Sequence, residues 1–409
     1  MTAAAPLPTQ VGRPDDSSGA NLQMPPTNSI ARMRTELLET FLGQMNKTQI
    51  PYCLLDGFQG YPEVISSDVD FMVRPNDATR IAPRLLEVAR RCGALMVQAI
   101  RHETGACYFV LAKQAGGAVA YLHPDCSTDY RRDGRLWMEA EQVIARRQRF
   151  KSFFVPVIAD EFLYYLTKKT LKQSITNAQW QRIMSLYLSN PRECRNRMRG
   201  VWSDETAEDL VAAFLRDEIG WMKIHLPALL SELQVSSPVE SWQKRLRQSL
   251  REWRRGLERV ANPTGLSVAV CRGTTQQRAE LAKMLEQNLR PAFRRTMICE
   301  EESVGDGLWS AIPVWRARLR STLVIRKKEA TNKEWLVGDE IEFVLSDGEA
   351  ANKRHFGEAN DGYVFLDRNR PPAQTLEHAT RITLHYLAAR LQRRMNLGGL
   401  PCISTESDA

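Results

Sequence analysis

The chain has 409 residues, 43% of them hydrophobic and 25% charged, and a formal net charge of +8 at pH 7. This composition is ordinary for a folded globular protein, and the length allows two or three domains of about 100–200 residues each. The sequence argues against a membrane-spanning, secreted or zinc-binding protein, because it has no long apolar run, no signal-peptide pattern and no metal-ligand spacing among its eight cysteines, so we expect a cytoplasmic protein.

The first part of the chain alternates between helical and strand patterns. Residues 1–28 are rich in Pro, Gly, Ser, Asn and Asp, which predicts a disordered segment. The elements predicted after it are a helix at 30–45, strands at 52–57 and around Asp68–Asp70, a helix at 77–94, and strands at 106–113 and 118–126. Strands that alternate with helices in this way predict an α/β or α+β domain over residues 29–150.

Residues 151–262 have helical spacing throughout. The predicted helices lie at 160–174, 179–188, 205–233 and 241–260. The last of these has an apolar face and many basic residues around it, and the apolar residues are Trp242, Leu246, Trp253, Leu257 and Val260. Such a helix can lie on anionic lipid or nucleic acid, but it is more often a packed helix with solvated arginines. The narrow apolar stripe favours packing.

A third domain is predicted over residues 263–409. Pro263 and Gly265 end the preceding helix, and LSVAV at 266–270 is typical of a buried strand. The elements predicted after it are a helix at 275–289, strands at 321–327, 340–346 and 362–368, and a helix at 373–395. This order predicts a parallel-sheet α/β fold that begins with a strand–loop–helix unit.

Two carboxylates, Asp68 and Asp70, lie one residue apart in the apolar segment SDVDFMV. Side chains at positions i and i+2 of a strand point to the same face, so the two anions repel each other unless a cation lies between them. Mg²⁺ or Mn²⁺ takes such oxygen ligands, and a third carboxylate, Asp125, closes a later apolar strand. The alternative is a strand end, where Ser67 and Asp68 cap a turn and Asp70 faces water. The local sequence leaves both interpretations open.

The order of these residues resembles the polymerase-beta-like nucleotidyltransferase superfamily. Its motif of an apolar residue, Gly, a short loop and Asp-apolar-Asp is matched by Leu55-Asp56-Gly57 and Ser67-Asp68-Val69-Asp70-Phe71. The family usually has Ser after the glycine, where Phe58 stands here. The branch found with bacterial surface-polysaccharide genes is the most similar, over about residues 50–200. The segments that resemble this branch are YCLLDGFQGYPEVISSDVDFMV, LHPDCSTDYRRDGRLW and VPVIADEFLYYLTKKTLK.

What this resemblance implies is nucleotidyl transfer to an acceptor hydroxyl. The cofactor would be Mg²⁺ or Mn²⁺ and the substrate a nucleoside triphosphate. The acceptor would be a sugar phosphate or a protein, and the partners would be polysaccharide-assembly proteins. The catalytic and metal-binding residues implied are Asp68, Asp70 and Asp125, and the nucleotide-binding residues implied are Gly57, Ser67, Lys168 and Lys172.

The third domain resembles the thymidylate-kinase-like P-loop module that often follows such a domain. A working phosphate loop needs glycines whose amides wrap the phosphates, a Lys for the β- and γ-phosphates, and a Ser or Thr for Mg²⁺. In CRGTTQQRAEL these places are taken by Gln277, Arg278 and Ala279. We therefore expect a degenerate P-loop, in a kinase-like fold without phosphoryl transfer.

Other polar residues have alternative interpretations. His123 could be a metal ligand or a base, but a histidine at a strand end is more often structural. Lys168, Lys169 and Lys172 could contact a triphosphate or an acidic sugar, or they could form a solvated helix face. The basic turn RRDGR at 131–135 could touch a substrate or be a plain surface turn.

Three functional classes remain. The first is a Mg²⁺-dependent nucleotidyltransferase that acts in surface-polysaccharide biosynthesis or its regulation. The second is a non-catalytic nucleotide- or protein-binding scaffold built from decayed nucleotide-binding folds. The third is a nucleic-acid binder, which is the least favoured because no recognised binding motif accompanies the basic charge. The retention of three mutually repelling carboxylates favours the enzyme.

Overall fold

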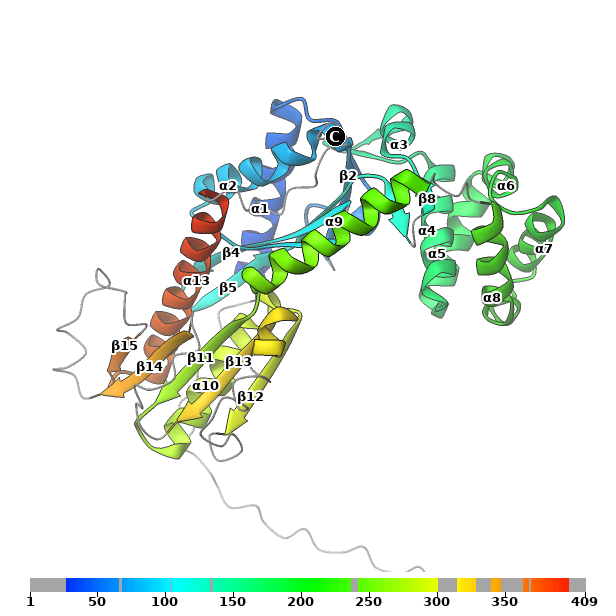
Figure 1. The fold of residues 1–409 in the computed structure, drawn as a ribbon. Helices are drawn as coiled ribbons and strands as arrows, with labels where there is room; N and C mark the ends of the chain where they lie inside the picture. The colour runs from blue at the N-terminus through cyan, green and yellow to red at the C-terminus, as the bar shows by residue number, and fades with distance from the viewer. Residues whose placement is uncertain are drawn as a thin grey trace, which may run out of the picture.

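The structure is a computed structural model, and it describes residues 27–65, 68–103, 105–132, 135–236, 242–300, 315–328, 340–346, 363–367 and 369–396. A six-stranded and a five-stranded sheet, each with helices against it, confirm the predicted mixed α/β class (Figure 1). The predicted disordered segment lies outside the described residues up to position 26, and the description starts with a helix at Thr27.

The six-stranded N-terminal sheet has the order β1-β2-β6-β4-β3, with β5 paired to β4. Its strands are β1 (Tyr52–Leu54), β2 (Val69–Val73), β3 (Leu95–Glu103), β4 (Ala106–Ala115), β5 (Ala118–Leu122) and β6 (Pro124–Ser127). Strands β2 and β6 run parallel, whereas the other neighbours are antiparallel. The sequence pattern does not predict β3, because irregularities in its pairing with β4 between Met96 and Gln98 and between Arg101 and Glu103 interrupt the side-chain alternation.

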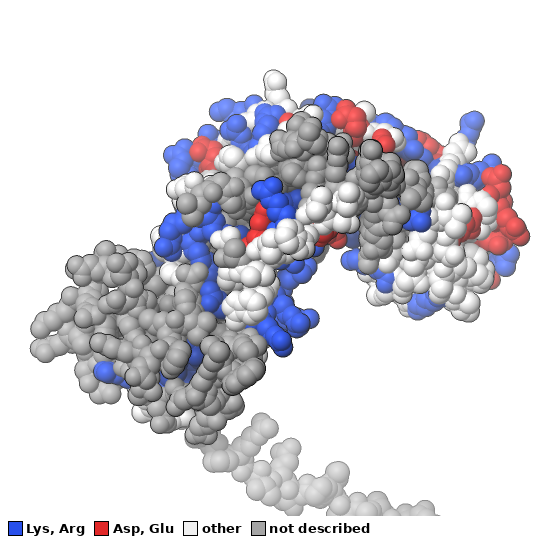
Figure 2. Space-filling model, in the orientation of Figure 1, with Lys and Arg blue, Asp and Glu red and all other residues white. Residues whose placement is uncertain are grey.

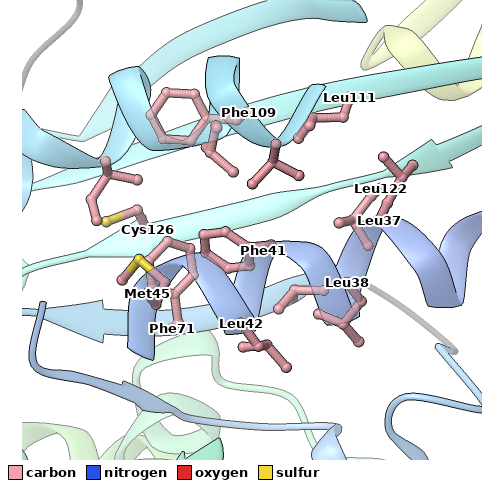
Figure 3. Packing of buried hydrophobic residues seen from close by; sticks show 14 of the residues in the cluster. Leu37, Leu38, Phe41, Leu42, Met45, Phe71, Phe109, Leu111, Leu122 and Cys126 are labelled. Carbon is pink, nitrogen blue, oxygen red and sulfur yellow. The ribbon is translucent and has the colours of Figure 1, made fainter. Parts of the chain in front are cut away.

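One face of this sheet packs against α1 (Thr27–Lys47) and α2 (Ile81–Arg91). Apolar residues recur along α1 at helical spacing, so its Leu, Phe and Met side chains point together into the sheet (Figure 3). Phe41 of α1 meets Phe71 of β2 edge to face, with the ring centroids 5.2 Å apart. The side of β2 that carries Phe71 is therefore buried in this core.

The opposite face of the sheet packs against the C-terminal domain. Its described helices include α10 (Thr275–Leu289), η3 (Arg290–Ala292) and α13 (Pro372–Asn396). Val110 of β4 and Tyr121 of β5 belong to the same buried cluster as Leu285 of α10 and Leu387 of α13. In Figure 1, α13 lies alongside the N-terminal sheet, where it contacts β3. The two domains thus share a hydrophobic core.

The C-terminal sheet has five parallel strands in the order β12-β13-β11-β14-β15. They are β11 (Leu266–Cys271), β12 (Arg295–Glu300), β13 (Thr322–Lys328), β14 (Glu340–Ser346) and β15 (Tyr363–Asp367). Strand β11 lies in the middle and is buried at every position, as is usual in a parallel sheet covered on both faces. The predicted parallel sheet is confirmed, and β12 is an additional strand that was not predicted from the sequence.

A helical region follows the N-terminal sheet. Its helices are α3 (Ala140–Arg146), α4 (Ile158–Lys172), α5 (Asn177–Ser189), α6 (Pro191–Arg199), α7 (Asp204–Leu215) and α8 (Ile219–Ser236). The single helix predicted at 205–233 is wrong, because Asp217 takes a left-handed conformation with φ 54° between α7 and α8. The Asp217 carboxylate accepts a hydrogen bond from Trp180 Nε1 at 2.7 Å, which fixes the break against α5.

Two short hairpins border the helical region, and a short helix follows each of β1 and β2. These elements are β7 (Tyr130–Arg132), β8 (Arg135–Met138), β9 (Gln148–Phe150), β10 (Phe153–Val155), η1 (Phe58–Gly60) and η2 (Pro75–Arg80). Phe153 and Val155 belong to the core that α1 covers. The N-terminal core therefore includes residues beyond position 150.

The helix α9 (Trp242–Ala261) differs from its prediction. Its apolar stripe, which was expected to pack, points outward, and Trp253 at its centre is 68% exposed. The expectation that its arginines are solvated is wrong for Arg255, whose side chain is only 20% exposed. No described helix combines the length and the apolar character needed to cross a bilayer.

Candidate functional site on the N-terminal sheet

Three neighbouring strands bring polar side chains into one row. Asp70 of β2 is the register partner of Asp125 on the parallel strand β6. Asp125 is in turn the partner of Tyr108 on β4. Because paired residues of neighbouring strands point to the same face, these three side chains lie side by side. Their strand neighbours Phe71 and Phe109 point the other way, into the core under α1.

Asp68 stands at the edge of this row, in the residue just before β2. Its Oδ1 accepts a hydrogen bond from the Tyr108 hydroxyl at 3.4 Å and lies 3.8 Å from Nδ1 of His123. The Asp68 side chain is 49% exposed, so it is the carboxylate of the three that borders open solvent. We name Asp68, Asp70 and Asp125 together the carboxylate row.

Lys168 is a cation beside the carboxylate row. It lies on α4, whose residues are mostly buried, and its Nζ donates a hydrogen bond to Oδ2 of Asp70 at 2.9 Å. The same nitrogen lies 4.0 Å from Oδ2 of Asp56 and 5.1 Å from the ring centroid of Tyr164. Burial acts to lower the pKa of Lys168, but Tyr164 and Asp70 outweigh it and the pKa is raised. Lys168 is therefore held in its charged form.

The pKa values of Asp125 and Asp68 are raised, mainly by burial. Burial raises the pKa of Asp125 to about 8, and the charges of Asp70 and Asp68 add to the rise while Lys168 opposes it. Burial also raises the pKa of Asp68, against the effect of His123. Lys168 alone therefore does not neutralise the carboxylate row. Binding of a proton or of a further cation would lower the remaining negative charge.

The donors of the carboxylate row fit a divalent cation by their chemistry. Mg²⁺ and Mn²⁺ prefer carboxylate oxygens, and β2 and β6 supply them from adjacent positions. The side chains do not converge, however. Within the described ranges, no three His, Cys, Asp or Glu residues are arranged to hold a metal ion. Asp70 is turned toward Lys168, which supplies the positive charge at this point.

His123 connects the carboxylate row to the C-terminal domain. Its ring lies nearly parallel to the rings of Tyr108 and Tyr121, with centroid separations of 5.7 and 6.1 Å. A carbonyl oxygen can only accept, so Nε2 of His123 carries the proton in its 2.9 Å hydrogen bond to the Pro291 carbonyl. Tyr121 donates to the Asn288 carbonyl at 2.7 Å. His123 thus has the contacts of a structural residue that also borders the site.

The residues that the resemblance implies for nucleotide binding lie in different places. Gly57 has φ 71°, a left-handed conformation that glycine adopts without strain, and it starts η1 after β1. Phe58, where the family has Ser, is buried and packs edge to face on Phe150. Lys172 is exposed at the end of α4, and Ser67 lies outside the described residues. Among the described residues implied for nucleotide binding, Lys168 is the one that contacts the carboxylate row.

The loop after β11 is closed by its own side chains. Only residues 272–274 separate β11 from α10. Thr274 and Gln277 form a capping box: Thr274 Oγ1 accepts from the Gln277 amide at 3.2 Å, and Gln277 Oε1 accepts from the Thr274 amide at 3.0 Å. Arg278 folds back and donates to the Gly273 carbonyl at 2.9 Å. Groups that a phosphate loop would offer to its ligand are therefore bound within the protein.

No protein-family model matches this sequence, and no curated protein matches it. The resemblance to nucleotidyltransferases and kinases thus stays an expectation, and function has to be argued from geometry. Two contacts of the site were missed by sequence reasoning. The only sequence signal for Asp56 as a site residue is its place before Gly57. Tyr108 reaches the site through the long-range pairing of β4 with β6, which no local sequence pattern predicts.

Proposed function

We propose that the protein is a divalent-metal-dependent nucleotidyltransferase whose active site is the carboxylate row. The observation that carries this proposal is the register of β2 and β6, which places Asp70 beside Asp125 on one face of the sheet. In this position the pKa of Asp125 is raised to about 8. Two carboxyl groups on paired positions repel each other once both are ionised, and burial makes the ionised form of Asp125 costly, so a purely structural sheet gains nothing from the pair. A bound cation removes that cost.

Each residue of the site has a role that its contacts support. Asp68, Asp70 and Asp125 are the residues that would hold Mg²⁺ or Mn²⁺, which when bound supplies Lewis-acid activation of a phosphate. Lys168 orients Asp70 and keeps a positive charge where a phosphate oxygen can use it. Asp68 faces solvent, from which the acceptor hydroxyl enters. Following the resemblance, the acceptor is a sugar phosphate or protein of surface-polysaccharide assembly.

A second function, that of a non-catalytic scaffold, is favoured by two specific observations. Phe58 is part of the core and offers no hydroxyl to a triphosphate, and the loop after β11 is closed. In that case Lys168 is the permanent counter-ion of Asp70, and the C-terminal domain serves as the cover of the N-terminal sheet. The two functions differ in whether the carboxylate row binds metal and nucleotide.

Calorimetric titration separates the two functions. We expect one of the common nucleoside triphosphates to bind wild type in the presence of Mg²⁺, with pyrophosphate released once an acceptor is supplied. Asp68→Asn and Asp125→Asn should each weaken binding by about tenfold or more, as happens when groups that hold a metal are lost. Asp204→Asn, which changes a carboxylate that is 83% exposed on α7, is the matched control and should bind like wild type.

The scaffold makes the opposite forecast. It holds if no nucleoside triphosphate binds wild type and Asp125→Asn melts at a higher temperature than wild type in metal-free buffer, because the substitution removes a buried carboxyl group that Asp70 and Asp68 also repel. Asp125 is the better choice for this comparison than Asp70, since replacing Asp70 would take from Lys168 its partner at 2.9 Å.

A further inference from the structure

The helix α9 presents an apolar stripe to solvent. Leu246, Leu250, Trp253, Leu257 and Val260 are 53%, 58%, 68%, 49% and 49% exposed. Their spacing of four, three, four and three residues puts them on one side of the helix. Figure 1 shows α9 crossing the front of the molecule, from the helical region to the C-terminal sheet. We call these five side chains the α9 stripe.

The opposite side of α9 is charged and lies against the protein. Arg255 pairs with Glu252, and its side chain is only 20% exposed. Arg259 donates a hydrogen bond at 3.0 Å to the backbone carbonyl of Arg101 on β3. Burial lowers the pKa of the Arg101 guanidinium, while Glu258 opposes the shift. These charged contacts set the rotation of α9 about its axis and hold the α9 stripe toward solvent.

The charge of α9 indicates which kind of surface fits the stripe. The helix contains seven Lys or Arg residues and two Glu residues. Both glutamates are paired within the helix, Glu252 with Arg255 and Glu258 with Arg254. Figure 2 shows white atoms along the described part of α9, with blue Lys and Arg atoms nearby. Arg254, beside the stripe, is 79% exposed, and the helix as a whole has more basic than acidic residues, so a surface that covers the stripe meets positive charge at its edge.

A partner helix fits these observations less well than a lipid surface does. The α9 stripe covers about two heptads, whereas a coiled coil usually needs three to four. Ser249 and Gly256 flank the stripe on one side and carry no charge, and the charged flanking residues on the other side are Arg247 and Arg254. A second copy in an antiparallel pair would therefore bring basic positions together. A flat anionic surface requires neither heptad length nor matched acidic residues.

We propose that α9 docks the protein on the surface of an anionic lipid bilayer. An amphipathic helix that carries Trp and Leu on one side and Lys and Arg around them lies in the plane of a bilayer interface. The indole of Trp253 sits at the level of the headgroups, and the basic residues of α9 attract the anionic lipid. The protein is held on one leaflet without crossing it. This docking is independent of the chemistry at the carboxylate row.

Co-sedimentation of the full chain with vesicles tests the proposal. We expect wild type to bind vesicles of phosphatidylcholine mixed with phosphatidylglycerol, to bind phosphatidylcholine alone much more weakly, and to be released by salt. The double variant Leu250→Ser/Trp253→Ser should lower the partition constant about tenfold or more, because each large apolar side chain contributes at least that factor when buried. Both residues are exposed, so its melting temperature should match wild type.

The control is a second pair of exposed apolar residues. Leu215 and Ile224, in the helical region, are 68% and 76% exposed, and Leu215→Ser/Ile224→Ser should bind vesicles like wild type. The proposal is overturned if wild type does not bind the anionic vesicles, or if both double variants lose binding equally. It is also overturned if light scattering without vesicles shows a dimer that Leu250→Ser/Trp253→Ser abolishes, because the α9 stripe is then a self-association surface.

Discussion

The carboxylate row and the loop after β11 both lie where a strand meets a loop, but their polar groups are engaged in opposite ways. In the row, Asp70 and Asp125 stand on paired positions, and burial together with this repulsion raises the pKa of Asp125 to about 8. In the loop, Thr274 and Gln277 satisfy each other, and Arg278 binds the backbone. A ligand can relieve the first arrangement, whereas the second has little left to offer one. We therefore expect ligand binding at the carboxylate row of the N-terminal sheet rather than at the loop after β11.

The same comparison explains how a domain with a closed loop keeps its fold. Leu285 and Leu387 of the C-terminal domain share a buried cluster with Val110 of the N-terminal sheet. Pro291 holds His123 through its carbonyl, next to Asp68. The C-terminal domain is thus needed to cover the sheet and to support the edge of the carboxylate row, whether or not it binds a nucleotide.

The largest effect is expected when Phe58 is replaced by serine, the residue that nucleotidyltransferases usually have after the glycine of the motif that this sequence resembles. Phe58 is 4% exposed and packs on Phe150 with ring centroids 5.6 Å apart. Replacing a buried Phe by a small side chain costs about 3–5 kcal/mol, so Phe58→Ser should lower the free energy of unfolding in urea by that amount. Phe58→Leu should cost no more than about 1.5 kcal/mol. A Phe58→Ser protein as stable as wild type, or one that gains nucleotide affinity, would show that this position belongs to the site.

An intermediate effect is expected from the titration of Asp125. Its pKa in the folded protein, about 8, lies above the unfolded value of 3.8, so between these values the folded state keeps a proton that the unfolded state has lost. Its contribution to stability is complete below about pH 4 and is lost as the pH rises through about 8, with a slope of up to about 1.4 kcal/mol per pH unit.

Urea unfolding at pH 6 and pH 8 in metal-free buffer measures this titration. The stability of wild type relative to Asp125→Asn should fall by about 2 kcal/mol between the two pH values. Asp204→Asn should follow wild type, because its carboxylate is exposed. If wild type and Asp125→Asn keep a constant difference in stability, the pKa of Asp125 is not raised in the folded protein, which would contradict the burial and repulsion inferred for this carboxyl group.

The sequence predicts those features that depend on local spacing. The alternation in SDVDFMV places Asp70 on the face opposite Phe71, and the strand–loop–helix pattern after Pro263 predicts β11 and α10. In each case the cause lies within about one turn or one strand, so one sequence is sufficient.

Features that depend on docking were not predictable. Lys168 reaches Asp70 because Tyr164, one turn earlier on α4, packs against residues of β1 and β2, and the sequence of α4 contains no information on that contact. The α9 stripe was expected to be buried, because helical periodicity shows that one face is apolar but does not show which way that face is turned. The contact of Arg259 with the Arg101 backbone decides the orientation, and it joins residues far apart in the chain.

The smallest effect on stability is expected at the loop after β11. A matched control for this loop exists at the start of α5. Thr176 and Gln179 form the same capping box at the start of α5 that Thr274 and Gln277 form at α10. If Thr274 acts only as a cap, Thr274→Ala and Thr176→Ala should each lower the free energy of unfolding by about 1 kcal/mol. Neither variant should gain or lose phosphoryl transfer from ATP, which the closed loop is expected to lack.

Added Mg²⁺ and ATP sharpen this last test. A nucleotide bound at the carboxylate row would stabilise Thr274→Ala and Thr176→Ala equally, because both keep that row intact. A nucleotide bound at the loop after β11 would stabilise Thr176→Ala more than Thr274→Ala, since the Thr274 variant has altered the start of α10. Equal shifts in melting temperature place any nucleotide outside the C-terminal loop. Unequal shifts would contradict the view that the capping box and Arg278 have closed it.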